Sequence, residues 1–243
     1  MLRIFCVLLC AALTGCGGGA DMTGFRASPV RARQVRVDWL GHQSFLFTSS
    51  LGTRILTNPF ASGTGGRSFP KNLKPDILLV STERADANNV DAVENSPTTF
   101  RGAVGMGPNN AAGITIRGIP TFKNPEQQTP EDMNLAFVWR QDGVRFCFLG
   151  NIERALTPVE AQQIGFVDVL FLPVGVPAGL SNDERRIILG QLQPRVIVPM
   201  GRGAAFTEFA AGFPAIHRLP GNSVLLSQEF IPPGQTVLIF SAP

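Results

Sequence analysis

Residues 78–93, LLVSTERADANNVDAV, run from an apolar strand into a polar loop and then into a predicted helix. A strand end that opens into a polar loop is where an α/β protein usually keeps its binding or catalytic groups. The loop at residues 81–89 has two acids and one arginine, but no histidine or cysteine. It therefore has the outline of a functional loop without a clear nucleophile or imidazole ligand.

Apolar runs separated by turn residues recur along the chain and predict strands. The early runs alternate and have short connections, which favours antiparallel strands. ILLV and VLFLPV are continuously apolar, which favours strands buried on both faces. The runs occupy residues 35–40, 44–49, 54–60, 76–81, 113–119, 134–140, 144–150, 167–175, 194–200 and 235–241.

Two segments between the later strands contain residues that are typical of helix ends. Residues 157–165 begin with Thr157 as a candidate N-cap, followed by proline, and end at Gly165. Residues 181–192 begin with Ser181 and have acids in the first turn. Strands followed by mixed strand and helix units predict an α/β domain with two sheets sandwiched between helices.

The first fifteen residues, MLRIFCVLLCAALTG, predict a secretory signal, because the apolar run is well short of the roughly 20 residues that span a bilayer. Leu-Thr-Gly-Cys at residues 13–16 resembles the bacterial lipobox, which implies cleavage before Cys16 and lipid on that residue. The alternative is an ordinary signal cut elsewhere, with Cys16 left as a stray thiol. Gly17, rather than Asp, follows the cysteine, which favours an outer-membrane anchor with the domain facing the periplasm.

We therefore divide the chain into a signal (1–15), a Gly-rich and then basic tether (16–34) and one domain (35–243). Cleavage before Cys16 would leave 228 residues with a formal charge of +2, which suits one core and gives no case for nucleic-acid binding. Cys147 would be the one thiol without lipid, so no intramolecular disulfide could form. The expected partner is a membrane, reached through the lipid on Cys16, and the sequence names no protein partner.

Five segments together resemble the metallo-β-lactamase-fold hydrolases, in particular the lactonase-like and phospholipase-D-like branch. That branch has a W-L-G-H-x-S-F strand turn, intact at residues 39–45, and an I-L-x-D-P strand end, where Asn58 replaces the acid. The resemblance implies a four-layer αββα sandwich of two mixed sheets. The segments are VDWLGHQSFLF (37–47), GTRILTNPF (52–60), KPDILLVSTERADANNVDAV (74–93), RFCFLGNIERALTPVEAQQIGFVDVLFLPVG (145–175) and LQPRVIVPM (192–200).

Members of this family hold one or two metal ions, usually zinc, at the strand ends, and the metal activates a water molecule. The ligand positions implied by the resemblance fall on Thr82, Arg84, Asp86, Ala87, Lys123, Asn151 and Gly201. Asp86 alone keeps a ligand side chain. The chain has two histidines, His42 and His217, and neither has a partner at ligand spacing. We therefore expect no metal cofactor and no catalytic residue.

Cationic Arg84 and Lys123 stand at positions where the family has neutral ligands. We expect one or both to pair with Asp86 or Glu83, so that a side-chain cation replaces the charge of the metal. Two alternatives remain: residues scattered by relaxed selection over a dead site, and a basic cleft that binds a small anionic ligand. His42 matches a family residue that is not a primary ligand and is expected to be structural or to line the pocket.

The leading interpretation is a membrane-anchored lipoprotein whose metallo-β-lactamase-like domain has lost metal binding and hydrolysis and acts as a binding or interaction module. The alternative is a metal-dependent hydrolase with an atypical or mononuclear site, which the resemblance by itself suggests. A third interpretation is a purely structural lipoprotein without a ligand. A serine or cysteine hydrolase is disfavoured, because Cys147 lies inside an apolar run and no serine has the G-x-S-x-G context.

Overall fold

The computed structural model describes residues 33–174, 179–201 and 204–241. Cys16, the signal and nearly all of the tether lie outside these residues. The described residues belong to one compact unit. Within the described ranges no helix is both long and apolar enough to cross a membrane.

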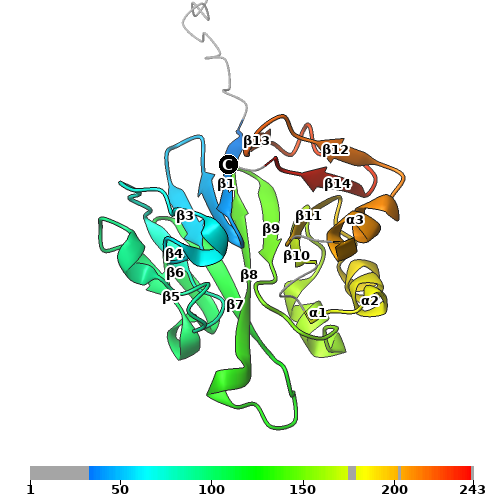
Figure 1. The fold of residues 1–243 in the computed structure, drawn as a ribbon, viewed down its shortest axis with the longest axis horizontal. Helices are drawn as coiled ribbons and strands as arrows, with labels where there is room; N and C mark the ends of the chain where they lie inside the picture. The colour runs from blue at the N-terminus through cyan, green and yellow to red at the C-terminus, as the bar shows by residue number, and fades with distance from the viewer. Residues whose placement is uncertain (1–32, 175–178, 202–203, 242–243) are drawn as a thin grey trace, which may run out of the picture. The chain divides into compact units, whose positions relative to one another are not determined.

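A six-stranded mixed sheet contains the first five strands of the chain and one late strand (Figure 1). Its order is β13-β1-β2-β3-β4-β5. The pairs β1–β2 and β2–β3 are antiparallel, as the alternating runs predict, whereas β3, β4 and β5 are parallel. The strands are β1 (Val35–Gly41), β2 (Ser44–Thr48), β3 (Arg54–Thr57), β4 (Ile77–Leu79), β5 (Thr98–Phe100) and β13 (Ser223–Leu226).

An eight-stranded mixed sheet faces the first, in the order β12-β14-β11-β10-β9-β8-β7-β6. Strand β10 lies between parallel neighbours and is buried along its whole length, which explains its continuously apolar sequence. The predicted α/β class with two mixed sheets is therefore confirmed. The strands are β6 (Gly107–Ala111), β7 (Ile114–Phe122), β8 (Met133–Gln141), β9 (Val144–Phe148), β10 (Val169–Pro173), β11 (Val196–Met200), β12 (Ile216–Arg218) and β14 (Thr236–Ile239).

Aromatic side chains fill the space between the sheets. Phe45 and Phe47 project from β2 and meet Phe171 of β10 at ring-centroid distances of 4.7 and 5.2 Å. Phe47 also contacts Trp139 edge-on at 4.9 Å. Full burial of one such side chain contributes about 1.5–3 kcal/mol, so this layer fixes the packing of one sheet on the other.

Three α-helices cover the outer face of the eight-stranded sheet (Figure 1). Thr157 and Ser181 each form a capping box at the start of a helix, as their sequence positions predict. The helices are α1 (Pro158–Ile164), α2 (Asn182–Leu192) and α3 (Ala204–Ala211). The sequence did not predict α3, because the G-R-G that precedes it is typical of a turn.

The outer face of the six-stranded sheet is covered by irregular chain and 3-10 turns, η2 (Thr64–Gly66) and η3 (Val90–Ala92). The helix predicted after the polar loop is wrong: η3 is a single turn. The chain soon reaches Pro97, and only three apolar side chains of this stretch pack on the sheet. The fourth layer of the sandwich thus lacks an α-helix among the described residues.

Candidate functional site

Polar side chains follow three strands that end at one edge of the two sheets. Asn58 comes directly after β3, Ser81 follows the parallel strand β4, and Asn151 follows β9 of the facing sheet. The carboxyl ends of parallel strands are where α/β proteins place their ligands. This edge is therefore the part of the fold in which a site is expected.

Asn58 is held by hydrogen bonds on both sides of its amide. Its Oδ1 accepts from the backbone N–H of Ser81 at 2.8 Å, and its Nδ2 donates to Ser81 Oγ at 2.8 Å and to Gln43 Oε1 at 3.1 Å. Asn58 is 1% exposed and has a φ of 36°, in the left-handed region that asparagine tolerates better than most residues. All hydrogen-bonding atoms of this side chain therefore have protein partners.

The network crosses from one sheet to the other through Gln43. Gln43 Nε2 donates to Asn151 Oδ1 at 2.6 Å, and the backbone N–H of Asn151 donates to Asn134 Oδ1 at 2.8 Å. Asn134 Nδ2 in turn donates to Thr121 Oγ1 and to the carbonyl of Leu149. We call the set Gln43, Asn58, Ser81, Asn134 and Asn151 the amide bridge. It joins the two sheets with uncharged groups.

Gly150 permits the close approach of the two sheets at the amide bridge. Its φ is +60°, and a β-carbon there would lie 2.4 Å from Ser81 Cβ and 2.6 Å from Asn134 Oδ1. Both contacts are too short for any real side chain. The backbone at Gly150 therefore lies directly against the bridge.

A cleft of about 220 Å³ lies beside the amide bridge and is lined in part by Asn134 and Asn151. Four of the seven positions that the resemblance assigns to metal ligands line it: Thr82, Arg84, Lys123 and Asn151. The cleft also contains three carboxylates, from Glu131, Asp132 and Glu153. It is consequently a small cleft with both signs of charge, rather than a basic one.

Glu153 contacts both cationic side chains of the cleft. Lys123 Nζ lies 2.9 Å from Glu153 Oε2, and Arg84 Nη1 lies 3.9 Å from Glu153 Oε1. The hydrogen bond that Lys123 donates to Glu153 raises the pKa of Lys123 above its ordinary value. Arg84 Nε also lies 3.3 Å from Asp86 Oδ1, which is one of the pairs expected from the sequence. Lys123 pairs with Glu153 rather than with Asp86 or Glu83, the partners expected from the sequence.

The remaining predicted site residues lie elsewhere. Asp86 does not line the cleft, and Ala87 is buried at 3% exposure. Gly201 and His42 line a separate small hollow of about 30 Å³. The Nε2 of His42 lies 2.9 Å from the carbonyl oxygen of Thr64, which gives His42 a structural role there. The structure thus does not bring Gly201 or His42 to the cleft.

The roles of Gln43, Asn134 and Glu153 were not predicted from the sequence. Gln43 occupies the variable position of the W-L-G-H-x-S-F motif, where no side chain is specified. Glu153 follows Asn151, a predicted site position, by two residues, and this nearness was the only indication in the sequence that Glu153 belongs to the site. Nothing in the sequence indicated a role for Asn134, because a single asparagine at the start of an apolar run is common.

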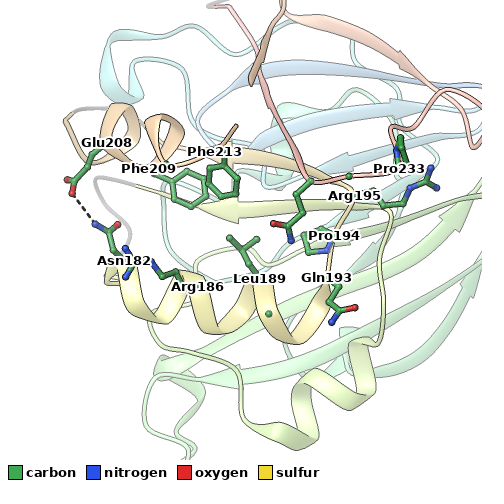
Figure 2. Close-up of a pocket in the computed structure, with 14 residues that line it drawn as sticks. Asn182, Arg186, Leu189, Gln193, Pro194, Arg195, Glu208, Phe209, Phe213 and Pro233 are labelled. Atoms are coloured by element: carbon green, nitrogen blue, oxygen red, sulfur yellow. Dashed lines mark hydrogen bonds between the residues drawn. The ribbon is translucent and has the colours of Figure 1, made fainter. Parts of the chain in front are cut away.

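A larger groove of about 800 Å³ lies among α2, α3 and the chain before β14 (Figure 2). Asn182 Nδ2 donates to Glu208 Oε1 at 3.3 Å across its mouth, and the rings of Phe209 and Phe213 lie 5.0 Å apart on one wall. This groove is on the helical side of the eight-stranded sheet, away from the strand ends of the amide bridge. The smaller cleft is therefore the better candidate for the site.

The family model of the β-lactamase superfamily domain matches residues 36–201. The chain belongs to the β-lactamase superfamily. The matched range includes the amide bridge and the residues of the cleft. A UPF0173 metal-dependent hydrolase from Archaeoglobus fulgidus is 24% identical over 194 residues, which are 68% of this chain and 82% of that protein.

Solved structures of the superfamily have the same fold. A proposed zinc-dependent hydrolase of the metallo-β-lactamase superfamily from Thermotoga maritima has a TM-score of 0.68 at 25% identity, covering 85% of this chain and 98% of that one. A proposed metal-dependent hydrolase from Parabacteroides distasonis has a TM-score of 0.62 at 17% identity, covering 87% of this chain and 94% of that one. The predicted family and fold are therefore confirmed.

The names of these relatives imply a metal ion, so the donor atoms at the strand ends decide whether one fits here. Zinc in proteins is held by thiolate, imidazole and carboxylate groups. The strand ends instead carry amides and a hydroxyl that bond to one another. Across the ranges that the structure describes, no three His, Cys, Asp or Glu side chains are grouped so that they could hold a metal ion. The residues present do not fit the metal centre of the superfamily.

Proposed function

We propose that this superfamily member is a ligand-binding module, and that the cleft beside the amide bridge is its ligand site. The observation that supports this proposal is the amide bridge itself. Its side chains occupy the strand ends, and most of their donors and acceptors bond to one another or to neighbouring groups of the chain, so they offer no free set of ligands to a metal. The neighbouring cleft keeps charged side chains at its surface, where they can meet a solute.

The charges of the cleft favour a small ligand with more than one polar group. Lys123 and Arg84 suit an anionic group such as a carboxylate or phosphate, but both already contact Glu153, so a simple anion must compete with that carboxylate. A zwitterion would also give Asp132 or Glu131 a cationic partner. The volume of about 220 Å³ is below the roughly 300–1,000 Å³ of sites for drug-sized ligands, so only a small molecule fits.

A thermal-shift experiment tests the ligand class. Amino acids, phosphate and small carboxylates would each be added to the purified chain, because a ligand at 100 times its Kd stabilises the folded state by about 2.7 kcal/mol. Lys123→Gln should remove the rise in melting temperature. Arg117→Gln is the matched control, since Arg117 is exposed on β7 and does not line the cleft. A rise that survives Lys123→Gln would place the ligand elsewhere, and no rise with any compound would favour a structural role.

A metal-dependent hydrolase with an atypical or mononuclear site is the second candidate. The superfamily match and the Archaeoglobus relative support this candidate more directly than they support a binding module. Elemental analysis after dialysis separates the two. Stoichiometric zinc, iron or manganese, together with hydrolysis of lactone or phosphodiester substrates that a chelator stops, would establish the hydrolase and reject the first proposal.

We also propose that the domain is held at a membrane by lipid on Cys16 and faces the periplasm from the outer membrane. The support is the lipobox-like Leu-Thr-Gly-Cys at residues 13–16, followed by Gly17. Mass spectrometry of the mature amino terminus should find acyl chains on Cys16. Cys16→Ala should leave the chain in the soluble fraction, and an unmodified Cys16 would reject the anchor.

A further inference from the structure

Three very exposed apolar side chains lie at one end of the sheets. Leu51, in the turn between β2 and β3, is 92% exposed. Phe230, after β13, is 72% exposed, and Phe166, before β10, is 70% exposed. Large apolar groups that are exposed together often mark a surface that contacts a partner or a membrane.

Contacts between neighbouring turns connect the three positions. Ser50 Oγ donates to Asp142 Oδ1 at 3.0 Å, and a β-carbon built on Gly143 would lie 3.9 Å from Gln228 Cβ. Gln228 Nε2 donates to Asp168 Oδ1 at 3.5 Å. Each of the three apolar residues lies within two residues of this line of contacts. We call Leu51, Phe166, Phe230 and these connecting residues the apolar tip.

The apolar tip and the cleft are at opposite ends of the strands. Strand β2 begins at Ser44, next to Gln43 of the amide bridge, and runs to Thr48, shortly before Leu51. Strand β1 is antiparallel to β2, so it begins at the tip end with Val35. The tether of the chain is therefore joined to the domain at the tip, and not at the cleft.

Two carboxylates of the tip, those of Asp142 and Asp168, are engaged by other groups, whereas the Glu229 side chain next to Phe230 is exposed. Asp142 accepts hydrogen bonds from both the backbone N–H and the hydroxyl of Ser50. Asp168 accepts from the backbone N–H of Arg145 at 2.8 Å and lies 3.6 Å from Arg195 Nη1. Their charges are thus partly neutralised inside the tip, which lowers the cost of bringing it to an anionic surface.

The length and charge of the chain before β1 indicate which partner this surface meets. Eighteen residues separate Cys16 from Val35, and they would span at most about 60 Å when extended and about 25 Å as a flexible coil. Three of them are arginines, at positions 26, 31 and 33. Arginines next to a lipid anchor are attracted to anionic headgroups, and exposed Phe and Leu side chains insert at the bilayer interface.

We propose that the apolar tip contacts the surface of the bilayer that holds the lipid on Cys16, so that the domain stands with its cleft directed away from the membrane. The proposal rests on the proposed lipid anchor and goes beyond it, because a tether of this length permits contact with the membrane without enforcing it. Leu51, Phe166 and Phe230 then act as a second, reversible attachment.

Fluorescent labels placed on the full, lipidated chain test this orientation. Leu51→Cys, Phe166→Cys and Phe230→Cys would each carry an environment-sensitive dye, in vesicles of phosphatidylethanolamine and phosphatidylglycerol. Cys147 is buried, and burial raises the pKa of its thiol, so the dye should react at the new cysteine. Val104→Cys is the matched control, because Val104 is also 70% exposed but lies in η4 (Gly102–Gly105), close to the loop beside the cleft.

The tip labels should shift to the blue on vesicle binding and be quenched by lipids brominated near the headgroup, while the label at position 104 keeps its emission in water. Vesicle-bound protein whose tip labels all behave like the control would overturn the tip contact and leave the anchor intact. A chain that does not float with the vesicles would reject the anchor and the tip contact together. A blue shift without vesicles would show that the tip binds another copy of the chain instead.

Discussion

Replacing Asn58 by alanine should destabilise the domain strongly, because the side chain is the centre of the amide bridge within the six-stranded sheet. Asn58→Ala removes the acceptor of the Ser81 backbone N–H and the donor to Gln43. Ser81 is 2% exposed, so its N–H would lose its partner without gaining free access to water. The substitution also puts a β-carbon without a polar group at a φ of 36°.

The size of the effect follows from these losses. A buried N–H left without a partner costs about 1–3 kcal/mol, and the weaker loss at Gln43 adds roughly 1 kcal/mol. The left-handed backbone costs alanine about 1 kcal/mol relative to asparagine. The free energy of unfolding should therefore fall by roughly 3–5 kcal/mol, a large part of the 5–15 kcal/mol of a typical domain.

Urea unfolding followed by tryptophan fluorescence measures this loss. Asn72→Ala is the matched control, because Asn72 has a φ of 63° but is exposed, so its replacement should cost only the backbone term of about 1 kcal/mol. If Asn58→Ala is no more destabilising than Asn72→Ala, the buried hydrogen bonds of Asn58 do not stabilise this edge of the six-stranded sheet, and the amide bridge is not the stabilising network described above.

Three further outcomes are expected. Gly150→Ala should lower the free energy of unfolding by about 2 kcal/mol or more in the same urea assay, because its φ and the 2.4 Å contact force the bridge apart. Cys147 should react with a thiol reagent only after unfolding, at every pH from about 7 to 9, because burial raises the pKa of the thiol. If Cys147 of the folded protein reacted as fast as an exposed cysteine, this expectation would be contradicted. The hydrogen bond from the backbone N–H at the cap of α2 lowers the pKa of Glu184, so its contribution is present above the ordinary carboxyl pKa and is lost as pH falls through the lowered value. Glu184→Gln should thus destabilise by less than about 1 kcal/mol at pH 7 and by nothing near pH 2, as urea titrations at both pH values would show.

Local signals were sufficient for ten strands and two of the helices, but they did not mark the strands β5, β6, β12 and β13, whose sequences carry no long apolar run. Thr157 with its following proline marked the start of α1, and Gly165 marked its end, because capping depends on a few neighbouring residues. The continuous run of β10 indicated a strand buried on both faces. Such signals did not reveal that the chain after the polar loop forms only the short η3 turn. The length of this turn depends on how it packs on the sheet face below it.

The site could be predicted only as a set of positions, and not as a set of contacts. Thr82, Arg84, Lys123 and Asn151 could be placed together because the resemblance supplied their arrangement. The bond from Gln43 to Asn151 joins residues 108 positions apart, and amide side chains are too common for that pairing to be read from the sequence. The role of Glu153 likewise depends on how the loop after β9 meets the end of β7.

The amide bridge also affects the step of folding in which the two sheets come together. Its donors and acceptors are all part of the polypeptide, so they are present as soon as the strands come together. Closing the two sheets at this edge then requires no ion from the surroundings. The yield of correctly assembled domain should therefore be the same whether the cell is grown with scarce or abundant zinc.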